Sequence, residues 1–134
     1  MNRLIYERLG SQVRCGRCRE PLASPMAPIE ISSSEDFDQL VAKSRVPVVV
    51  DYWAPWCGPC RVVAPEVAKV ASRAAGRFVV VKVNTDVLSD LGERFKILSI
   101  PTLAVYANGR EIARTSGARP AADIEAFVEQ ARDR

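Results

Sequence analysis

An almost continuously apolar run that ends at a pair of cysteines constrains the fold more than any other feature of the sequence. Residues 46–53 read VPVVVDYW, and Asp51 is the single charge among them. A strand that is apolar on both sides is typical of a sheet centre with both faces covered. Cys57 and Cys60 follow closely, and apolar residues then recur at helical spacing over 63–74. These residues predict a buried strand, a turn that carries the cysteines, and a helix that packs back onto the strand.

The remaining pattern alternates strands and helices along the chain. Ser32 and Glu35 resemble a capping box, which predicts a helix that begins just after them. Further elements are expected at 29–31 (strand), 78–83 (strand), 88–95 (short helix), 103–106 and 111–115 (a hairpin around Asn108-Gly109), and 124–131 (helix). Helical crossovers allow the early strands to pair in parallel, whereas the late hairpin must be antiparallel. The predicted class is α/β, with a central mixed β-sheet flanked by helices on both faces.

Length and composition indicate one domain with an appendage. The chain has 134 residues, of which 48% are hydrophobic, enough for one ordinary core. Residues 1–28 have no sustained periodicity and end in a proline-rich linker, so they are expected to be a short irregular extension, with the folded domain at 29–134. Basic and acidic residues are mixed and the net charge is only +3, which argues against nucleic acid as a partner. Without an apolar leader or a membrane-length run, a cytoplasmic location and no membrane contact are expected.

The central cysteines have the spacing of a redox pair. Cys57 is predicted at the start of a helix, where unpaired N–H groups and the helix dipole favour a thiolate. Cys60 lies one turn further on, close enough for a disulfide, so Cys57 is assigned as nucleophile and Cys60 as resolving thiol. Gly58 is expected to permit a tight turn, and Pro59 to occupy a first helical turn that needs no N–H. A buried structural pair or half of a metal site is the alternative.

The segment VDYWAPWCGPCR at residues 50–61 resembles the active-site signature of the thioredoxin family, and the resemblance extends from about Ile29 to the C-terminus. It implies a thioredoxin fold and a dithiol–disulfide oxidoreductase that reduces protein disulfides without a cofactor. The implied partners are disulfide-containing proteins and an NADPH-dependent thioredoxin reductase that restores the dithiol, with the protein acting as a monomer. A module that only docks partners is the competing class, which loss of either Cys57 or Cys60 would have favoured.

The resemblance also assigns roles to residues around the dithiol. Asp51 matches the family's general base for the resolving cysteine, and Lys82 matches a lysine close to it; a simple ion pair is the alternative. Ile100 and Pro101 match a cis-proline loop whose backbone pairs with substrate strands and whose proline keeps metals off the cysteines; an ordinary turn is the alternative. The substrate surface is expected to include Trp56, Gly58, Pro59, Ile100, Pro101, Gly117 and Ala118, with Trp53 packed in the interior.

A second pair of cysteines lies in the extension. Cys15 and Cys18 resemble one knuckle of a zinc ribbon, and some bacterial thioredoxins carry two such knuckles before the redox domain. A closed zinc site needs four ligands, and the chain has no histidine. Three interpretations stay open: an upstream knuckle missing from this version of the chain, a zinc shared between two protomers, or a second dithiol without metal.

Overall fold

The computed structural model describes residues 27–74 and 76–133. Cys15 and Cys18, and with them residues 1–26 of the predicted extension, lie outside the described residues. The proposed division of the chain between residues 28 and 29 therefore stays a prediction. Within the described part, no helix is long and apolar enough to cross a membrane.

The centre of the fold is one mixed five-stranded sheet in the order β1-β3-β2-β4-β5. Its strands are β1 (Ile29–Glu30), β2 (Val48–Trp53), β3 (Val79–Asn84), β4 (Thr102–Ala107) and β5 (Arg110–Ser116). β3 pairs in parallel with both β1 and β2, whereas β4 is antiparallel to β2 and to β5. Asn108 and Gly109 join β4 to β5 with positive φ angles of 54° and 84°, as a tight hairpin turn requires. The predicted mixed sheet is confirmed.

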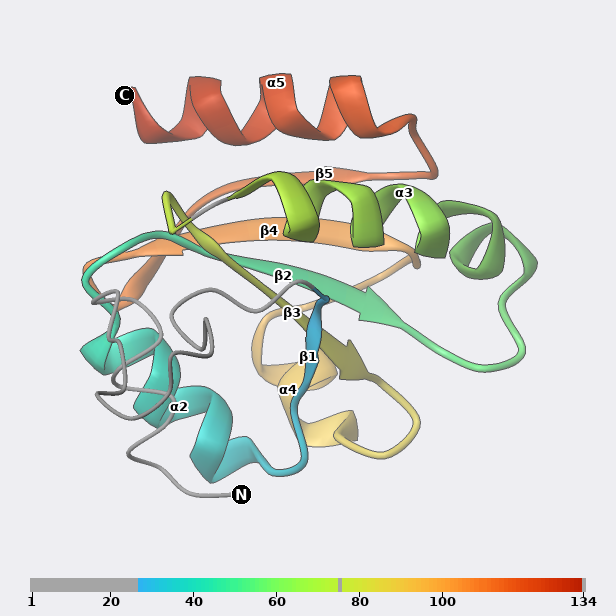
Figure 1. The fold of residues 1–134 in the computed structure, drawn as a ribbon. Coiled ribbons are helices and arrows are strands. Elements are labelled where there is room, and N and C mark those ends of the chain that lie inside the picture. Colours follow the sequence, from blue (N-terminus) through green and yellow to red (C-terminus); the bar gives the residue numbers. More distant parts are fainter. Residues whose placement is uncertain (1–26, 75, 134) are drawn as a thin grey trace, which may run out of the picture.

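Helices cover both faces of this sheet, as predicted (Figure 1). α2 (Ser34–Lys43) and α4 (Ser89–Arg94) lie on one face, and α3 (Gly58–Ala74) and α5 (Ala121–Arg132) lie on the other. Side chains alternate along β2, so Val50 packs with α2 and α4, whereas Val49 packs with α3 and α5. Asp51 lies two residues after Val49 on β2 and therefore projects to the same face of the sheet. This places the only charge of β2 under α3.

The start of α2 and the end of α3 are each set by one residue. α2 is capped by Ser33, whose hydroxyl accepts the N–H of Asp36 at 3.1 Å, so the predicted capping box at Ser32 and Glu35 is wrong by one residue. Either serine satisfies the sequence pattern, and only the backbone decides which one caps. Gly76 follows α3 with a φ of 83°, a left-handed conformation that ends the helix.

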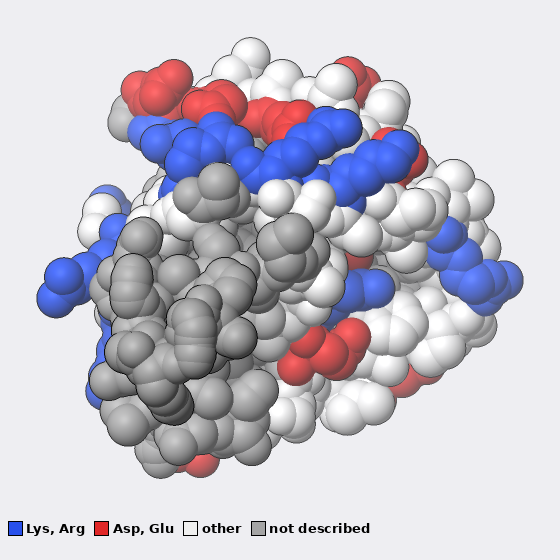
Figure 2. Space-filling view, viewed as in Figure 1, with Lys and Arg blue, Asp and Glu red and all other residues white. Residues whose placement is uncertain are grey.

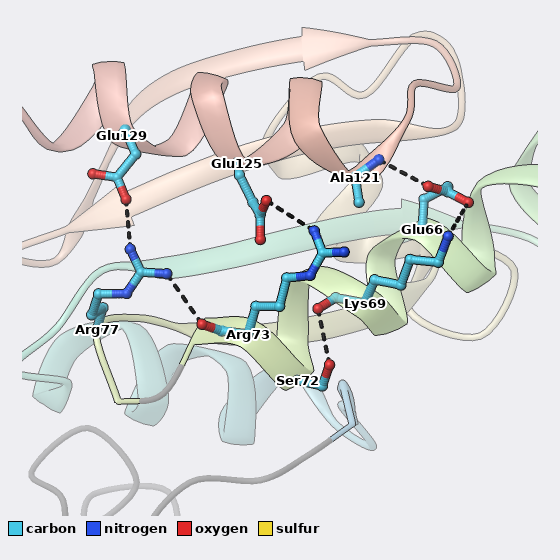
Figure 3. A network of polar contacts seen from close by, with 8 residues as sticks. All are labelled: Glu66, Lys69, Ser72, Arg73, Arg77, Ala121, Glu125 and Glu129. Atoms are coloured by element: carbon cyan, nitrogen blue, oxygen red, sulfur yellow. Dashed lines mark hydrogen bonds and ion pairs between the residues drawn. The ribbon is translucent and has the colours of Figure 1, made fainter.

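Ion pairs join α3 to α5 along one side of the molecule (Figure 3). Arg73 contacts Glu125 at 3.2 Å, and Arg77 contacts Glu129 at 2.8 Å. Glu66 accepts the N–H of Ala121 at 2.9 Å, so a side chain of α3 caps the first turn of α5. Figure 2 shows the resulting rows of basic and acidic side chains side by side on the surface. The two helices on this face are therefore fixed to each other.

Candidate functional site

Cys57 and Cys60 form a disulfide at the start of α3, with their Cα atoms 5.2 Å apart. The carbonyl of Cys57 accepts the N–H of Arg61 at 3.2 Å, and its Sγ accepts the N–H of Cys60 at 3.1 Å. Cys57 thus occupies the N-cap position, with sulfur in the place of the usual cap oxygen. After reduction, the same N–H and the helix dipole would stabilise a thiolate at this sulfur.

Two further loops meet the dithiol. The Ile100–Pro101 peptide bond is cis, and the carbonyl oxygen of Ile100 lies 3.8 Å from Cys57 Sγ. Gly117, at a φ of 97°, donates its N–H to the Pro101 carbonyl at 2.9 Å. The structure thus brings together Cys57, the Ile100–Pro101 loop and the Gly117 turn, although the sequence separates them widely.

An apolar surface lies beside the disulfide. Both cysteines are themselves buried, at 3% and 4% exposure, whereas Trp56 is 67% exposed and Leu98 is 94% exposed. A hollow of about 340 Å³ is lined by Trp56, Thr85, Gly92, Ile97, Leu98, Ser99 and Ile100. The indole Nε1–H of Trp56 donates to Asp86 at 3.2 Å, which fixes the ring over one side of this hollow. Exposed apolar groups around a buried disulfide are suited to contact with another protein.

Asp51 lies under α3, the helix whose first turn carries Cys60. Its side chain is 1% exposed, and among the described residues its Oδ1 has no hydrogen-bond partner. Burial raises the pKa of Asp51 from 3.8 to about 6, while Lys82 lowers it and Glu30 raises it. A buried carboxyl group of this kind can take up and release a proton near neutral pH.

Sequence reasoning missed Glu30 and misplaced Trp53. Trp53 is only partly buried, so the expectation that it packs in the interior is wrong in part. Its indole Nε1–H donates to Glu30 at 3.2 Å, and its ring lies 4.7 Å from Lys82 Nζ. The alternation of Ile29-Glu30-Ile31 indicates that Glu30 lies on the face opposite the two isoleucines, but only the pairing of β1 with β3 places it beside Lys82.

The expectation for Gly58 is also not supported. A Cβ atom at Gly58 would meet nothing within 4 Å, and Gly58 is not among the glycines with positive φ. A tight turn therefore does not require glycine here, and the position instead leaves open space next to Cys57. Pro59 is the second residue of α3, in the first turn where its missing N–H leaves no intrahelical bond unmade, as predicted.

A disulfide held at the start of a helix, between a cis-proline loop and an exposed apolar surface, defines the protein as a dithiol–disulfide oxidoreductase. Comparison with known proteins agrees with this class. The family model described as Thioredoxin matches residues 28–130. The chain therefore belongs to the thioredoxin family.

Individual relatives show how far the similarity extends. Thioredoxin C-3 of Corynebacterium nephridii is 36% identical over 129 residues, which cover 96% of this chain and 87% of the relative. Thioredoxin 1 of Nostoc sp. is 45% identical over 94 residues, covering 70% and 88% of the two chains. The solved structure of a mutant thioredoxin from Halobacterium salinarum NRC-1 is similar with a TM-score of 0.73 and 25% identity, covering 81% of this chain and 94% of that one. The thioredoxin fold predicted from the sequence is confirmed.

Proposed function

We propose that this oxidoreductase reduces disulfides of other proteins, with Cys57 as nucleophile and Cys60 as resolving thiol. The observation that carries the proposal is the hydrogen bond from the Cys60 N–H to Cys57 Sγ at 3.1 Å, because it favours negative charge on Cys57 rather than on Cys60. The dithiol itself carries the electrons, so thioredoxins need no cofactor for catalysis. An NADPH-dependent thioredoxin reductase would restore the dithiol after each turnover.

The proposed reaction has two exchange steps. The Cys57 thiolate attacks one sulfur of a substrate disulfide, forming a mixed disulfide and releasing the other substrate sulfur as a thiolate that takes up a proton. Cys60 then loses its proton and attacks Cys57 Sγ, which breaks the mixed disulfide and releases the second substrate thiol. The substrate gains two electrons and two protons, and the protein ends as the Cys57–Cys60 disulfide.

Two single variants test the order of the cysteines. Cys60→Ser should trap a stable mixed disulfide with a protein substrate such as insulin, because the resolving thiol is absent. Cys57→Ser should trap none and should abolish turnover with NADPH and thioredoxin reductase. Turnover that survives Cys57→Ser would reject the enzyme and favour a module that only docks partners. Trapping by Cys57→Ser alone would reverse the assignment of the two thiols.

Asp51 is the proposed base that takes the proton from Cys60, with Lys82 as its charged neighbour. Its burial, its pKa of about 6 and its place under α3 support this role. Asp51→Asn should slow resolution of the mixed disulfide at neutral pH and leave the first attack by Cys57 largely intact. Stopped-flow measurement of the two steps separates them, and an unchanged rate of resolution would remove Asp51 from the mechanism.

The substrate surface is proposed to comprise Trp56, Gly58, Pro59, Ile100, Pro101, Gly117 and Ala118. The 3.8 Å approach of the Ile100 carbonyl to Cys57 Sγ supports pairing of a substrate strand at this loop. Pro101 would also keep metal ions from the dithiol. Pro101→His should then bind zinc in the reduced protein, and a metal-free reduced variant would contradict this part of the proposal.

The N-terminal extension is proposed to resemble the zinc-ribbon segment of certain bacterial thioredoxins. The similarity to the Corynebacterium nephridii relative leaves out only about five residues of this chain, so Cys15 and Cys18 fall within it. Two thiolates are too few for a closed zinc site in one chain, and Cys57 and Cys60 are joined to each other. A shared zinc, a missing upstream knuckle and a metal-free dithiol all remain proposals.

Native mass spectrometry of the reduced, intact protein distinguishes these proposals. One zinc held between two chains would establish a metal-linked dimer, whereas a metal-free monomer would leave a second dithiol or the remnant of a knuckle. The same measurement tests the predicted monomeric state. A cytoplasmic location also stays a prediction, since the family relatives include both bacterial proteins and chloroplast thioredoxins of the M type.

A further inference from the structure

A row of charged side chains crosses three strands on the face of the sheet that α3 and α5 cover. Glu30 on β1 is the register partner of Lys82 on β3, and Lys82 is the register partner of Asp51 on β2. Register partners on neighbouring strands project to the same face of a sheet. One cation therefore lies between two carboxyl groups.

Trp53 contacts two members of this row, Glu30 and Lys82. Its Nε1–H donates to Glu30 Oε2 at 3.2 Å, and its ring faces Lys82 Nζ at 4.7 Å. The row also runs from outside to inside, because Glu30 is exposed, Lys82 is partly buried and Asp51 is 1% exposed. Partial burial raises the pKa of Glu30 itself, while the hydrogen bond from Trp53 and the charge of Lys82 lower it. Above its own pKa, Glu30 is an anion with a fixed position relative to a buried group that the proposed reaction uses.

We propose that Glu30 is a positioning residue that sets the proton affinity of Asp51 from the edge strand, by sharing Lys82 with it. An anionic Glu30 draws part of the attraction of Lys82 away from Asp51 and repels the charge on Asp51 directly. Both effects favour the protonated form of Asp51 and make its carboxylate a stronger base. The consequence for catalysis rests on the proposed role of Asp51 as the base for Cys60.

The surroundings of Asp51 leave few other charges to account for its protonation. Its partner on β4 is Leu103, which is apolar. Among the buried residues of α3, only Cys60 can titrate, and only after the disulfide is reduced. In the described part of the chain, the charged groups that act on Asp51 are Lys82, which lowers its pKa, and Glu30, which raises it.

The expected size of the effect follows from the spacing of the strands. Neighbouring strands lie about 4.8 Å apart, so positions two strands apart are separated by roughly 10 Å. Two unit charges at roughly 10 Å change a proton affinity about twofold in bulk water and about fifteenfold at the effective dielectric constant of a protein surface. Loss of the Glu30 charge should therefore make Asp51 more acidic by at least about twofold.

The direct test is Glu30→Gln in the full-length, oxidised protein. Gln keeps an oxygen that can accept from Trp53 and removes only the charge. Carboxyl ¹³C NMR, with Asp51→Asn to assign the signal, should show the Asp51 midpoint at lower pH in Glu30→Gln than in the wild type. Glu93→Gln is the matched control, because Glu93 is exposed on α4, which covers the opposite face of the sheet. This control should leave the midpoint in place.

Two further measurements separate tuning from a merely structural role. The pH profile of mixed-disulfide resolution should keep a similar plateau rate while its acid limb moves to lower pH in Glu30→Gln. In a Lys82→Met background, Glu30→Gln should shift the Asp51 midpoint less, because the shared cation is gone.

A midpoint that stays in place, that rises, or that moves equally in Glu93→Gln would overturn the proposal. A resolution rate that falls equally at all pH values, with an unmoved acid limb, would also overturn it, since Glu30 would then only support the fold. If the NMR midpoint moves but Asp51→Asn does not slow resolution, the control of Asp51 by Glu30 stands and the role of Asp51 as base falls.

Discussion

Replacing Asp51 by Asn should stabilise the folded, oxidised protein at neutral pH. Burial raises the pKa of Asp51 from 3.8 to about 6, so the folded state holds this proton more tightly than the unfolded state does. The favourable contribution is complete below pH 3.8 and is lost as pH rises through about 6. Above that pH, the wild type must keep an ionised carboxylate in a buried site, whereas asparagine carries no charge there.

The magnitude follows from the interval between the two pKa values. Each tenfold change in proton affinity corresponds to about 1.4 kcal/mol, so the interval from 3.8 to about 6 amounts to about 3 kcal/mol in the free energy of unfolding. Asp51→Asn should therefore be as stable as the wild type near pH 3.5, within about 1 kcal/mol, and more stable by about 3 kcal/mol at pH 8.

Urea unfolding of both proteins at several pH values between 3.5 and 8 measures this difference. Asp123→Asn is the control for loss of one negative charge, because Asp123 is exposed in the first turn of α5. A stability difference between wild type and Asp51→Asn that is constant with pH would refute the reasoning, as would a less stable Asp51→Asn at pH 8. Either result would mean that burial does not control the protonation of this carboxyl group.

Three further predictions concern packing, backbone and surface charge. The hydroxyls of Tyr52 and Tyr106 lie 2.6 Å apart in the core, so Tyr52→Phe should cost about 1–3 kcal/mol in urea unfolding, whereas adding Tyr106→Phe should cost little more because no hydroxyl is then left unpaired. Gly117→Ala should cost about 1–2 kcal/mol through its φ of 97° alone, since a Cβ there meets nothing within 4 Å; an unchanged midpoint would show that this turn relaxes. Arg73→Met should cost less than about 1 kcal/mol, because its pair with Glu125 is solvent-exposed, and a larger loss at high salt would contradict this view.

Much of the fold followed from the sequence because its signals are local and agree with one another. The apolar run that became β2 needed two covered faces, and the hairpin at Asn108-Gly109 needed positive φ at both residues. The disulfide between Cys57 and Cys60 followed from their spacing at a helix start. Each of these features is decided within a few residues along the chain.

The features that escaped prediction depend on contacts between distant segments. Glu30 acts beside Asp51 only because β3 lies between their strands, and no local pattern states that strand order. Trp53 stays partly exposed because Glu30 and Lys82 hold its ring at the sheet edge. The cap that Glu66 provides for α5 joins residues that are 55 positions apart. Alternation along a strand shows which face a residue occupies but not which charges it will meet there.

The fastening of α5 to α3 has a mechanical consequence. Arg77 binds two carbonyls at the end of α3 through its Nε and Nη2 atoms, and its Nη1 binds Glu129 on α5. Glu66 joins the two helices again, nearer the end of α3 that carries Cys57. A pulling force on the C-terminus would therefore pass from α5 to α3 through these side-chain contacts as well as through the packed apolar faces of the two helices. A cargo or surface tether fused after the last helix would thus pull on the helix that holds the disulfide.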